Sequence, residues 1–164
     1  MKTLYLIRHA KSSWDDLGLK DFDRPLMDTG IKKTNKIIKF LIERKVFPEL
    51  IISSPAVRAF ETARIIAQGI GYPEEKIVTE AALYDSSADD YIQIIENLRN
   101  EINSVMIFGH NPTITYAANS FLKKATEMIP TSGVVSVTFD TDKWSEVRKA
   151  KVKREFFIFP KMLK

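Results

Sequence analysis

Short apolar runs alternate with segments of helical periodicity along most of the chain. Runs rich in Ile, Val and Leu occur at "TLYLIR", "ELIISS", "KIVTE" and "SVMIFG", and each predicts a strand. Such alternation is typical of an α/β layer fold. No internal repeat, low-complexity tract or Gly/Ser linker interrupts it, so we expect a single domain over residues 1–164.

Four segments between and after these runs predict helices. In three of them, apolar residues recur at helical spacing and mark the face that should be buried. These faces comprise Ile31, Thr34, Ile38, Leu41 and Ile42 after Asp28; Ala59, Ala63, Ile66, Ala67 and Ile70; and Tyr91, Ile94, Ile95, Leu98 and Ile102. The fourth helix is expected to start in "NPTITYAANSFL".

Helix starts are signalled by capping residues at three places. Ser54 is the predicted N-cap of the second helix, and Ser87 with Asp90 resembles a capping box at the third. Asn111 is the predicted cap of the fourth helix, with Pro112 inside it. These caps predict where the helix begins after each of three predicted strands.

The C-terminal third has a different pattern. "GVVSVTFD" and "KVKREFFIFP" are β-rich and are separated by the connection "TDKWSEV", so they are expected to pair antiparallel and extend the sheet. The architecture consistent with all segments is a three-layer α/β/α sandwich with a mainly parallel, mixed sheet.

Composition excludes several classes of chemistry. The chain has no cysteine, which removes disulfides, zinc–thiolate sites and thiol nucleophiles, including cysteine-based phosphatase chemistry. The apolar run "LYLI" is shorter than a signal peptide requires, and no run approaches the length of a membrane span. We therefore expect a cytoplasmic protein without a membrane partner. The net charge of +4 suits a partner that carries negative charge.

Other motifs give little support to competing functions. The chain contains neither a Walker-type phosphate loop nor a G-x-S-x-G elbow. The pairs "DFD" (Asp21–Asp23) and "DTD" (Asp140–Asp142) are interpreted as loop and turn residues, and "DSSADD" as helix capping. "KAKVKRE" has the alternation of a strand with one solvated face and lacks interleaved aromatic residues, so we expect no nucleic-acid partner.

Polar residues follow at once where three predicted strands end, in "LYLIRH", "LIISSPAVR" and "VMIFGHNP". The carboxyl ends of strands form the ligand crevice of an open α/β sheet, so Arg8, His9, Arg58 and His110 should meet at one edge. Arg58 lies in the first turn of its helix, where free N–H groups favour an anion. This set predicts a pocket for a compact dianion such as phosphate.

Two histidines without a convergent carboxylate make a poor metal site. The imidazoles are therefore expected to act as nucleophile or as hydrogen-bond donor. A neutral His9 can attack phosphorus through one ring nitrogen while the other donates to a backbone carbonyl. The flanking cations would neutralise the phosphoryl oxygens, and water would then release phosphate from the phosphohistidine.

The motifs "LIRHAKSSW", "DFDRPLMDTG", "SSPAVRAFETA" and "FGHNPTI" resemble the histidine phosphatase superfamily, and within it the small SixA-type phosphohistidine phosphatases. The resemblance implies a phosphoglycerate mutase-like fold and a metal-independent phosphatase without a cofactor. It also implies that His9 is the phosphorylated nucleophile, that Arg8, Arg58 and His110 hold the phosphoryl group, and that Arg24 is a further anion contact.

The chain departs from the family pattern at two points. The usual third residue of the signature is Gly, and here it is Ala10. The general acid that commonly follows the third strand has two candidates, Glu80 and Asp85, and neither matches the family position clearly. A phosphohistidine substrate manages without such an acid, because a protonated imidazole leaves easily.

We therefore expect hydrolysis of protein phosphohistidine through a covalent intermediate on His9, with a His-containing phosphotransfer domain as one kind of substrate. Nothing in the chain is long enough to form a lid, so an open site should admit a phosphorylated protein. One alternative is a broad phosphomonoesterase for small phosphorylated metabolites. Another is an inactive module that binds phosphoproteins or nucleic acid. With no apolar stripe left outside the core, a monomer is expected.

Overall fold

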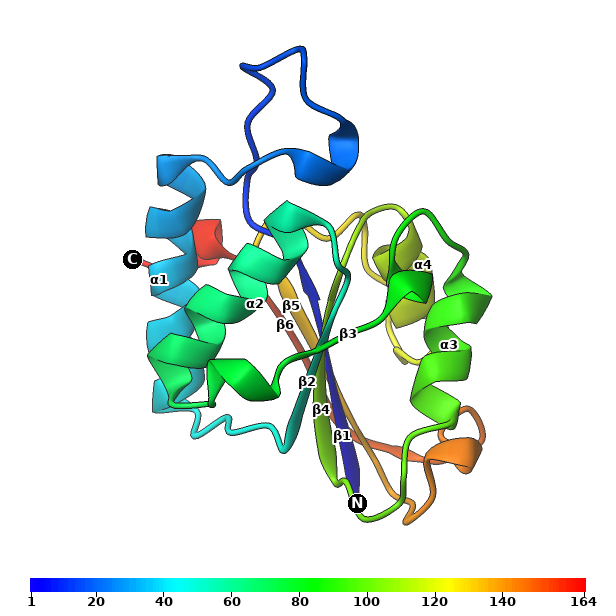
Figure 1. The fold of residues 1–164 in the computed structure, drawn as a ribbon. Helices are drawn as coiled ribbons and strands as arrows, with labels where there is room; N and C mark the ends of the chain where they lie inside the picture. The colour runs from blue at the N-terminus through cyan, green and yellow to red at the C-terminus, as the bar shows by residue number, and fades with distance from the viewer.

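The computed structural model describes residues 1–164 and contains a six-stranded sheet in the order β3-β2-β4-β1-β5-β6 (Figure 1). The first four strands in chain order run parallel to one another, whereas β5 pairs antiparallel with both β1 and β6. The strands are β1 (Lys2–Arg8), β2 (Leu50–Ser53), β3 (Val78–Thr79), β4 (Ser104–Gly109), β5 (Val134–Phe139) and β6 (Val152–Ile158). Every predicted strand is present, and the antiparallel C-terminal pair is confirmed.

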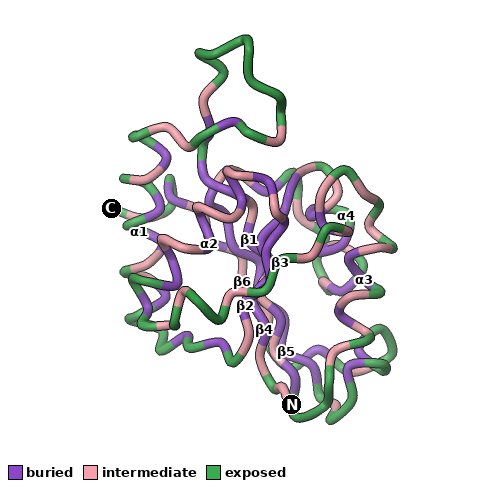
Figure 2. The backbone as a smooth tube through the Cα atoms, viewed as in Figure 1, coloured by how far each residue is buried: buried purple, intermediate pink, exposed green.

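Helices cover both faces of the sheet and complete the expected three layers (Figure 1). α1 (Asp28–Glu43) and α2 (Val57–Ile70) pack on one face, and α3 (Ala88–Glu96) and α4 (Thr113–Asn119) pack on the other. Each helix pair buries its own apolar cluster against the strands. Buried residues accordingly concentrate along the sheet and on the helix sides that face it (Figure 2).

The predicted buried face is confirmed for α2 and needs correction for the helices on either side of it in the sequence. In α1 the buried residues are Gly30, Thr34, Ile37 and Leu41, whereas Ile42 is 46% exposed. Gly30 packs against the backbone of Lys11, so the inner face of α1 includes a position that a stripe of apolar side chains does not mark. α3 ends at Glu96, so the predicted stripe residues Leu98 and Ile102 lie beyond the helix.

Of the predicted helix caps, only the capping box of α3 is confirmed. Ser87 Oγ accepts from the N–H of Asp90, and the Asp90 carboxylate accepts from the N–H of Ser87. α2 instead begins at Val57 after Ala56, and α4 begins at Thr113 after Pro112. The side chains predicted as their caps bind distant partners: Ser54 Oγ lies 2.7 Å from His110 Nε2, and Asn111 Nδ2 donates to the carbonyl of Ile129 at 2.7 Å.

Strand register brings several chain segments to one edge of the sheet, the edge at which the carboxyl ends of the parallel strands lie. Ile7 at the end of β1 is paired with Phe108 of β4 and with Val134 of β5, and Val134 is in turn paired with Ile158 of β6. The ends of β1, β4 and β6 and the start of β5 therefore share this edge. The segment 10–27 projects from it as an extended loop (Figure 1). None of the helices combines the length and apolar character needed to cross a membrane.

Candidate active site

Four of the predicted site residues meet at this edge. Arg8 ends β1, His9 follows it, His110 follows β4, and Arg58 lies in the first turn of α2. The ring centroids of His9 and His110 are 5.3 Å apart, and Arg58 Nε lies 3.4 Å from His9 Nε2. Parallel pairing of the strands that precede these residues is what aligns them.

His9 is held as a neutral imidazole with one defined tautomer. Its Nδ1 lies 2.7 Å from the carbonyl oxygen of Ala10, which can only accept, so Nδ1 carries the hydrogen and Nε2 keeps its lone pair. Burial lowers the pKa of His9 to about 3, with further lowering by His110, Arg58 and Arg8. The lone pair of Nε2 is therefore available throughout the neutral range, as a nucleophile requires.

Two arginines flank His9: Arg58 is buried and Arg8 is half-buried. Burial and the neighbouring Arg58 lower the pKa of Arg8, while its Nη1 donates to the carbonyl of Ile129 at 3.0 Å. Arg8 Nε is buried without any protein partner. Because a buried donor without a partner is costly, this nitrogen indicates a group organised to meet an external acceptor.

His110 is fixed by contacts to its backbone and to its ring. Its N–H donates to the hydroxyl of Tyr91 at 3.1 Å, and its Nε2 lies 2.7 Å from Ser54 Oγ. Ser54 Oγ also accepts from the N–H of Ala56 at 3.2 Å, and its own hydrogen can be donated to Nε2. In the tautomer that accepts this hydrogen, Nδ1 of His110 carries the ring hydrogen, and Nδ1 has no protein partner. Burial and Arg58 lower the pKa of His110 to about 4.

Asp21 is the functional position that the sequence interpretation missed. The motif "DFD" lies outside the helices and strands, as its sequence predicts, and forms a short 3₁₀ turn, η1 (Asp21–Asp23). That turn directs Asp21 at Arg58, whose Nη1 donates to the Asp21 carbonyl at 2.7 Å and whose Nη2 donates to its carboxylate at 3.0 Å. Tyr84 donates to the same carboxylate at 2.8 Å. The one available sequence signal was the place of this aspartate within the family motif "DFDRPLMDTG".

The environment of Asp21 keeps its carboxylate ionised. Burial works to raise the pKa of Asp21, but hydrogen bonds from Tyr84, Arg58 and Arg24 outweigh it and lower the pKa to about 2. Asp21 consequently cannot deliver a proton near neutral pH. It orients Arg58 and offsets one of the positive charges of the site.

A cavity of about 430 Å³ opens above these groups. Arg58 and His110 form part of its wall together with Asp21, and both also contact His9, which is 7% exposed beneath them. The other lining residues are Leu83, Tyr84, Asp85, Ser86, Tyr91, Asn111, Pro112 and Thr113. The cavity wall thus combines the Arg58 guanidinium and the His110 imidazole with two carboxyl groups and two tyrosines, and neither Arg8 nor His9 is among its lining residues.

Arg24 is not brought into the cavity. Its Nε donates to the carbonyl of Ser13, its Nη1 to Asp21 and its Nη2 to Ser12, so every guanidinium nitrogen has a protein partner. The guanidinium also stacks on Trp14, with its central carbon 3.1 Å from the ring centroid. Arg24 organises the projecting segment and reaches the site only through Asp21.

The two candidate acids occupy different places. Asp85 lines the cavity, in a left-handed backbone conformation with φ of 50°. Glu80 lies before the short turn Ala81–Leu83 and is not among the residues that line the cavity. Of the pair, only Asp85 is placed where a substrate would enter. No group of three or more His, Asp or Glu side chains is placed to hold a metal ion.

Known proteins share both the fold and the motifs of this chain. The family model of the histidine phosphatase superfamily (branch 1) matches residues 4–101. An uncharacterised chloroplastic protein of Arabidopsis thaliana is 35% identical over 88% of this chain and 70% of its own length. Phosphohistidine phosphatase SixA of Escherichia coli is 25% identical, covering 84% of this chain and 85% of its own length.

A solved structure of the protein histidine phosphatase SixA complexed with tungstate superimposes on this chain with a TM-score of 0.84. It is 23% identical and covers 99% of both chains, which establishes the likeness of fold. The layer order and mixed sheet are those of a phosphoglycerate mutase-like fold.

The chain belongs to the histidine phosphatase superfamily. It is a histidine phosphatase by class, which confirms the class of enzyme that the motifs predicted.

Proposed function

We propose that the chain hydrolyses phosphohistidine in proteins, with His9 as the nucleophile. The observation that carries this proposal is the state of His9: a buried neutral imidazole whose Nε2 lone pair faces Arg58 Nε at 3.4 Å. Nε2 would attack phosphorus, forming an N–P bond as the bond to the leaving group breaks. Water would then attack the phosphorylated His9 and release inorganic phosphate.

The donors around His9 support transfer of a phosphoryl group. Arg8 Nε and His110 Nδ1 are buried without protein partners, and Arg58 Nε is directed at the atom that attacks. These three donors would bind the equatorial oxygens, where negative charge is concentrated in the transition state. Asp21 would hold the guanidinium of Arg58 in this orientation through its carbonyl and carboxylate.

The absence of a pre-arranged strong acid favours a phosphohistidine substrate over an alkyl phosphate. Asp21 stays ionised because its pKa is about 2, and Asp85 is exposed at the rim of the cavity. An imidazole leaving group takes up a proton readily on its own nitrogen, whereas an alkoxide requires a well-placed donor. The name of the Escherichia coli relative, phosphohistidine phosphatase SixA, agrees with this assignment.

Trapping of the intermediate tests the nucleophile. Brief reaction with a ³²P-labelled, histidine-phosphorylated phosphotransfer domain, quenched in alkali, should label the tryptic peptide that contains His9. His9→Ala should lose both label and turnover. His110→Ala is the matched control, because His110 is the only other histidine: it should react more slowly and still label His9. Label on another residue, or undiminished turnover in His9→Ala, would overturn the assignment.

Substrate comparison tests the specificity. Rates should be measured with the phosphorylated domain, phosphoserine and p-nitrophenyl phosphate under the same conditions. The proposal expects the highest kcat/KM for phosphohistidine. A clear preference for alkyl phosphates would instead support a phosphomonoesterase for small metabolites.

A further inference from the structure

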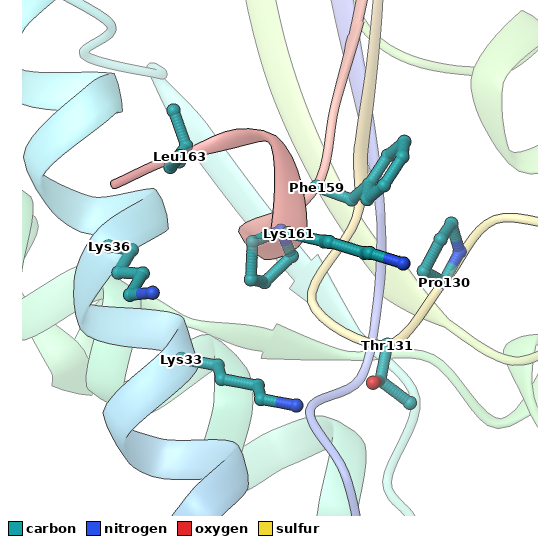
Figure 3. A pocket seen from close by; sticks show the side chains of 8 residues that line it. Lys33, Lys36, Pro130, Thr131, Phe159, Lys161 and Leu163 are labelled. Atoms are coloured by element: carbon teal, nitrogen blue, oxygen red, sulfur yellow. The ribbon is translucent and has the colours of Figure 1, made fainter.

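A second cavity, of about 460 Å³, lies at the same edge of the sheet and is lined mainly by basic and apolar side chains. It is formed by α1, the loop before β5 and the C-terminal turn η5 (Pro160–Met162). Lys33 of α1 and Lys161 of η5 extend side by side, Lys33 toward Thr131 and Lys161 toward Pro130 (Figure 3). We call this surface the basic groove; its lining residues are Lys33, Lys36, Pro130, Thr131, Phe159, Pro160, Lys161 and Leu163.

The basic groove has no acidic side chain in its wall. Its three lysines, Lys33, Lys36 and Lys161, are exposed, and none is within ion-pair distance of a carboxylate. On α1, Lys36 has further lysines one turn away on both sides, at Lys32 and Lys39. Like charges at this spacing destabilise a helix, so fold stability does not account for them. The groove is complementary to a negatively charged partner.

The basic groove is connected to the active site through the chain segment before β5. The loop that forms one wall continues into Ser132, whose N–H donates to the carbonyls of both Arg8 and His9 at 3.1 Å. Ser132 Oγ lies 2.8 Å from Thr34 Oγ1 of α1, on the helix that carries two of the lysines. Phe159 follows β6, which is two strands away from β1, so the groove begins roughly 10 Å from the end of β1 at the usual strand spacing.

We propose that the basic groove docks an acidic segment of the phosphorylated protein while its phosphohistidine occupies the active site. This inference rests on the proposed function. An extended chain advances about 3.3 Å per residue, so roughly 10 Å corresponds to an acidic segment that begins about three residues from the phosphohistidine. The lysines bind its carboxylates, and the apolar walls at Phe159 and Leu163 accept side chains between them.

The test compares two phosphohistidine peptides that differ only in this segment. One carries four glutamates beginning three residues from the phosphohistidine, and the other carries four serines there. The parent enzyme should show kcat/KM about tenfold higher for the glutamate peptide, as expected for three exposed charge pairs. Lys33→Gln/Lys36→Gln/Lys161→Gln should abolish that preference and leave turnover of p-nitrophenyl phosphate unchanged. Raising the salt to 0.5 M should weaken the parent's preference by screening.

A control variant removes the same total charge elsewhere. Lys76→Gln/Lys143→Gln/Lys149→Gln changes three exposed lysines at the opposite edge of the sheet. It should retain the parent's preference for the glutamate peptide. If both variants lost the preference for the glutamate peptide equally, the net charge of the protein and not the groove would cause that preference, and the proposal would be overturned.

The remaining outcomes separate this inference from the proposed function. Equal hydrolysis of both peptides by the parent enzyme would refute docking and leave phosphohistidine hydrolysis intact. Hydrolysis of p-nitrophenyl phosphate with neither peptide turned over would overturn both. Binding of a fluorescent single-stranded oligonucleotide that is lost in the groove variant, without any preference for the glutamate peptide, would assign the groove to nucleic acid and refute docking of a protein.

Discussion

Replacement of Tyr91 by Phe should weaken both the fold and the active site, because one hydroxyl serves two buried backbone groups. The Tyr91 hydroxyl donates to the carbonyl of Leu83 at 2.8 Å and accepts from the N–H of His110 at 3.1 Å. Tyr91 itself is fully buried. Burial raises the pKa of Tyr91 to about 12, so the hydroxyl stays protonated at any working pH. Phe keeps the ring packing and leaves both backbone groups without a partner.

The expected loss follows from the cost of unsatisfied groups. Each buried backbone donor or acceptor left without a partner costs about 1–3 kcal/mol, so two give about 2–4 kcal/mol once the site relaxes. With a urea dependence of about 2 kcal/mol per M, the midpoint of urea denaturation should fall by about 1–2 M. The turnover of p-nitrophenyl phosphate should fall as well, since the same bond positions His110.

Tyr72→Phe is the matched control for Tyr91→Phe. The Tyr72 hydroxyl donates to the carbonyl of Lys76 at 3.2 Å and accepts from the N–H of Ile51 at 3.3 Å, both longer contacts. Tyr72 is partly exposed, so water can replace the hydroxyl and the cost should stay below about 1 kcal/mol. A midpoint shift for Tyr91→Phe no larger than for Tyr72→Phe would refute the reasoning.

Three further predictions concern acidity, packing and the projecting segment. The pKa of His9 is about 3 and that of His110 about 4, so below about pH 6.5 the two histidines bind protons in the unfolded chain but not in the folded site. The free energy of unfolding should therefore fall as the pH is lowered. Between pH 6.5 and 5 each should cost about 2 kcal/mol, measured by urea denaturation and reduced in the His→Gln variants. Gly30→Ala should cost about 1–3 kcal/mol in the free energy of unfolding, because its Cβ would lie 2.6 Å from a backbone oxygen of the segment 10–27. Arg24→Ala removes the bonds that hold this segment, so chymotrypsin should cleave it at least several-fold faster than in the parent; equal cleavage rates would contradict that role.

The strands and the four central site residues could be predicted because their signals are local. Strands buried on both faces read as short runs of Ile, Val and Leu, and the end of each run fixes where the next polar residue emerges. Arg8, His9 and His110 each follow such a run directly. Parallel topology then places them together without any knowledge of side-chain contacts.

The residues that the sequence interpretation missed reach the site through long-range contacts. Asp21 comes from a loop without periodicity and meets Arg58 across 37 positions of the chain. Ser54 has the appearance of a helix cap, yet its hydroxyl is engaged by His110 across 56 positions. Tyr91 looks like an ordinary core residue of α3, because periodicity reports that a ring is buried and not what its hydroxyl binds.

The pairing of Asp21 with Arg58 has a consequence for the end of the catalytic cycle. With both histidines neutral, Arg8 and Arg58 supply two positive charges and Asp21 offsets one, while Asp85 is a second carboxyl group in the cavity wall, so the net positive charge that meets a phosphate is at most +1. Inorganic phosphate near neutral pH carries up to two negative charges, so the pocket does not fully neutralise its product. Product affinity is thereby limited, and the site is cleared for the next substrate instead of being blocked by the phosphate it has made.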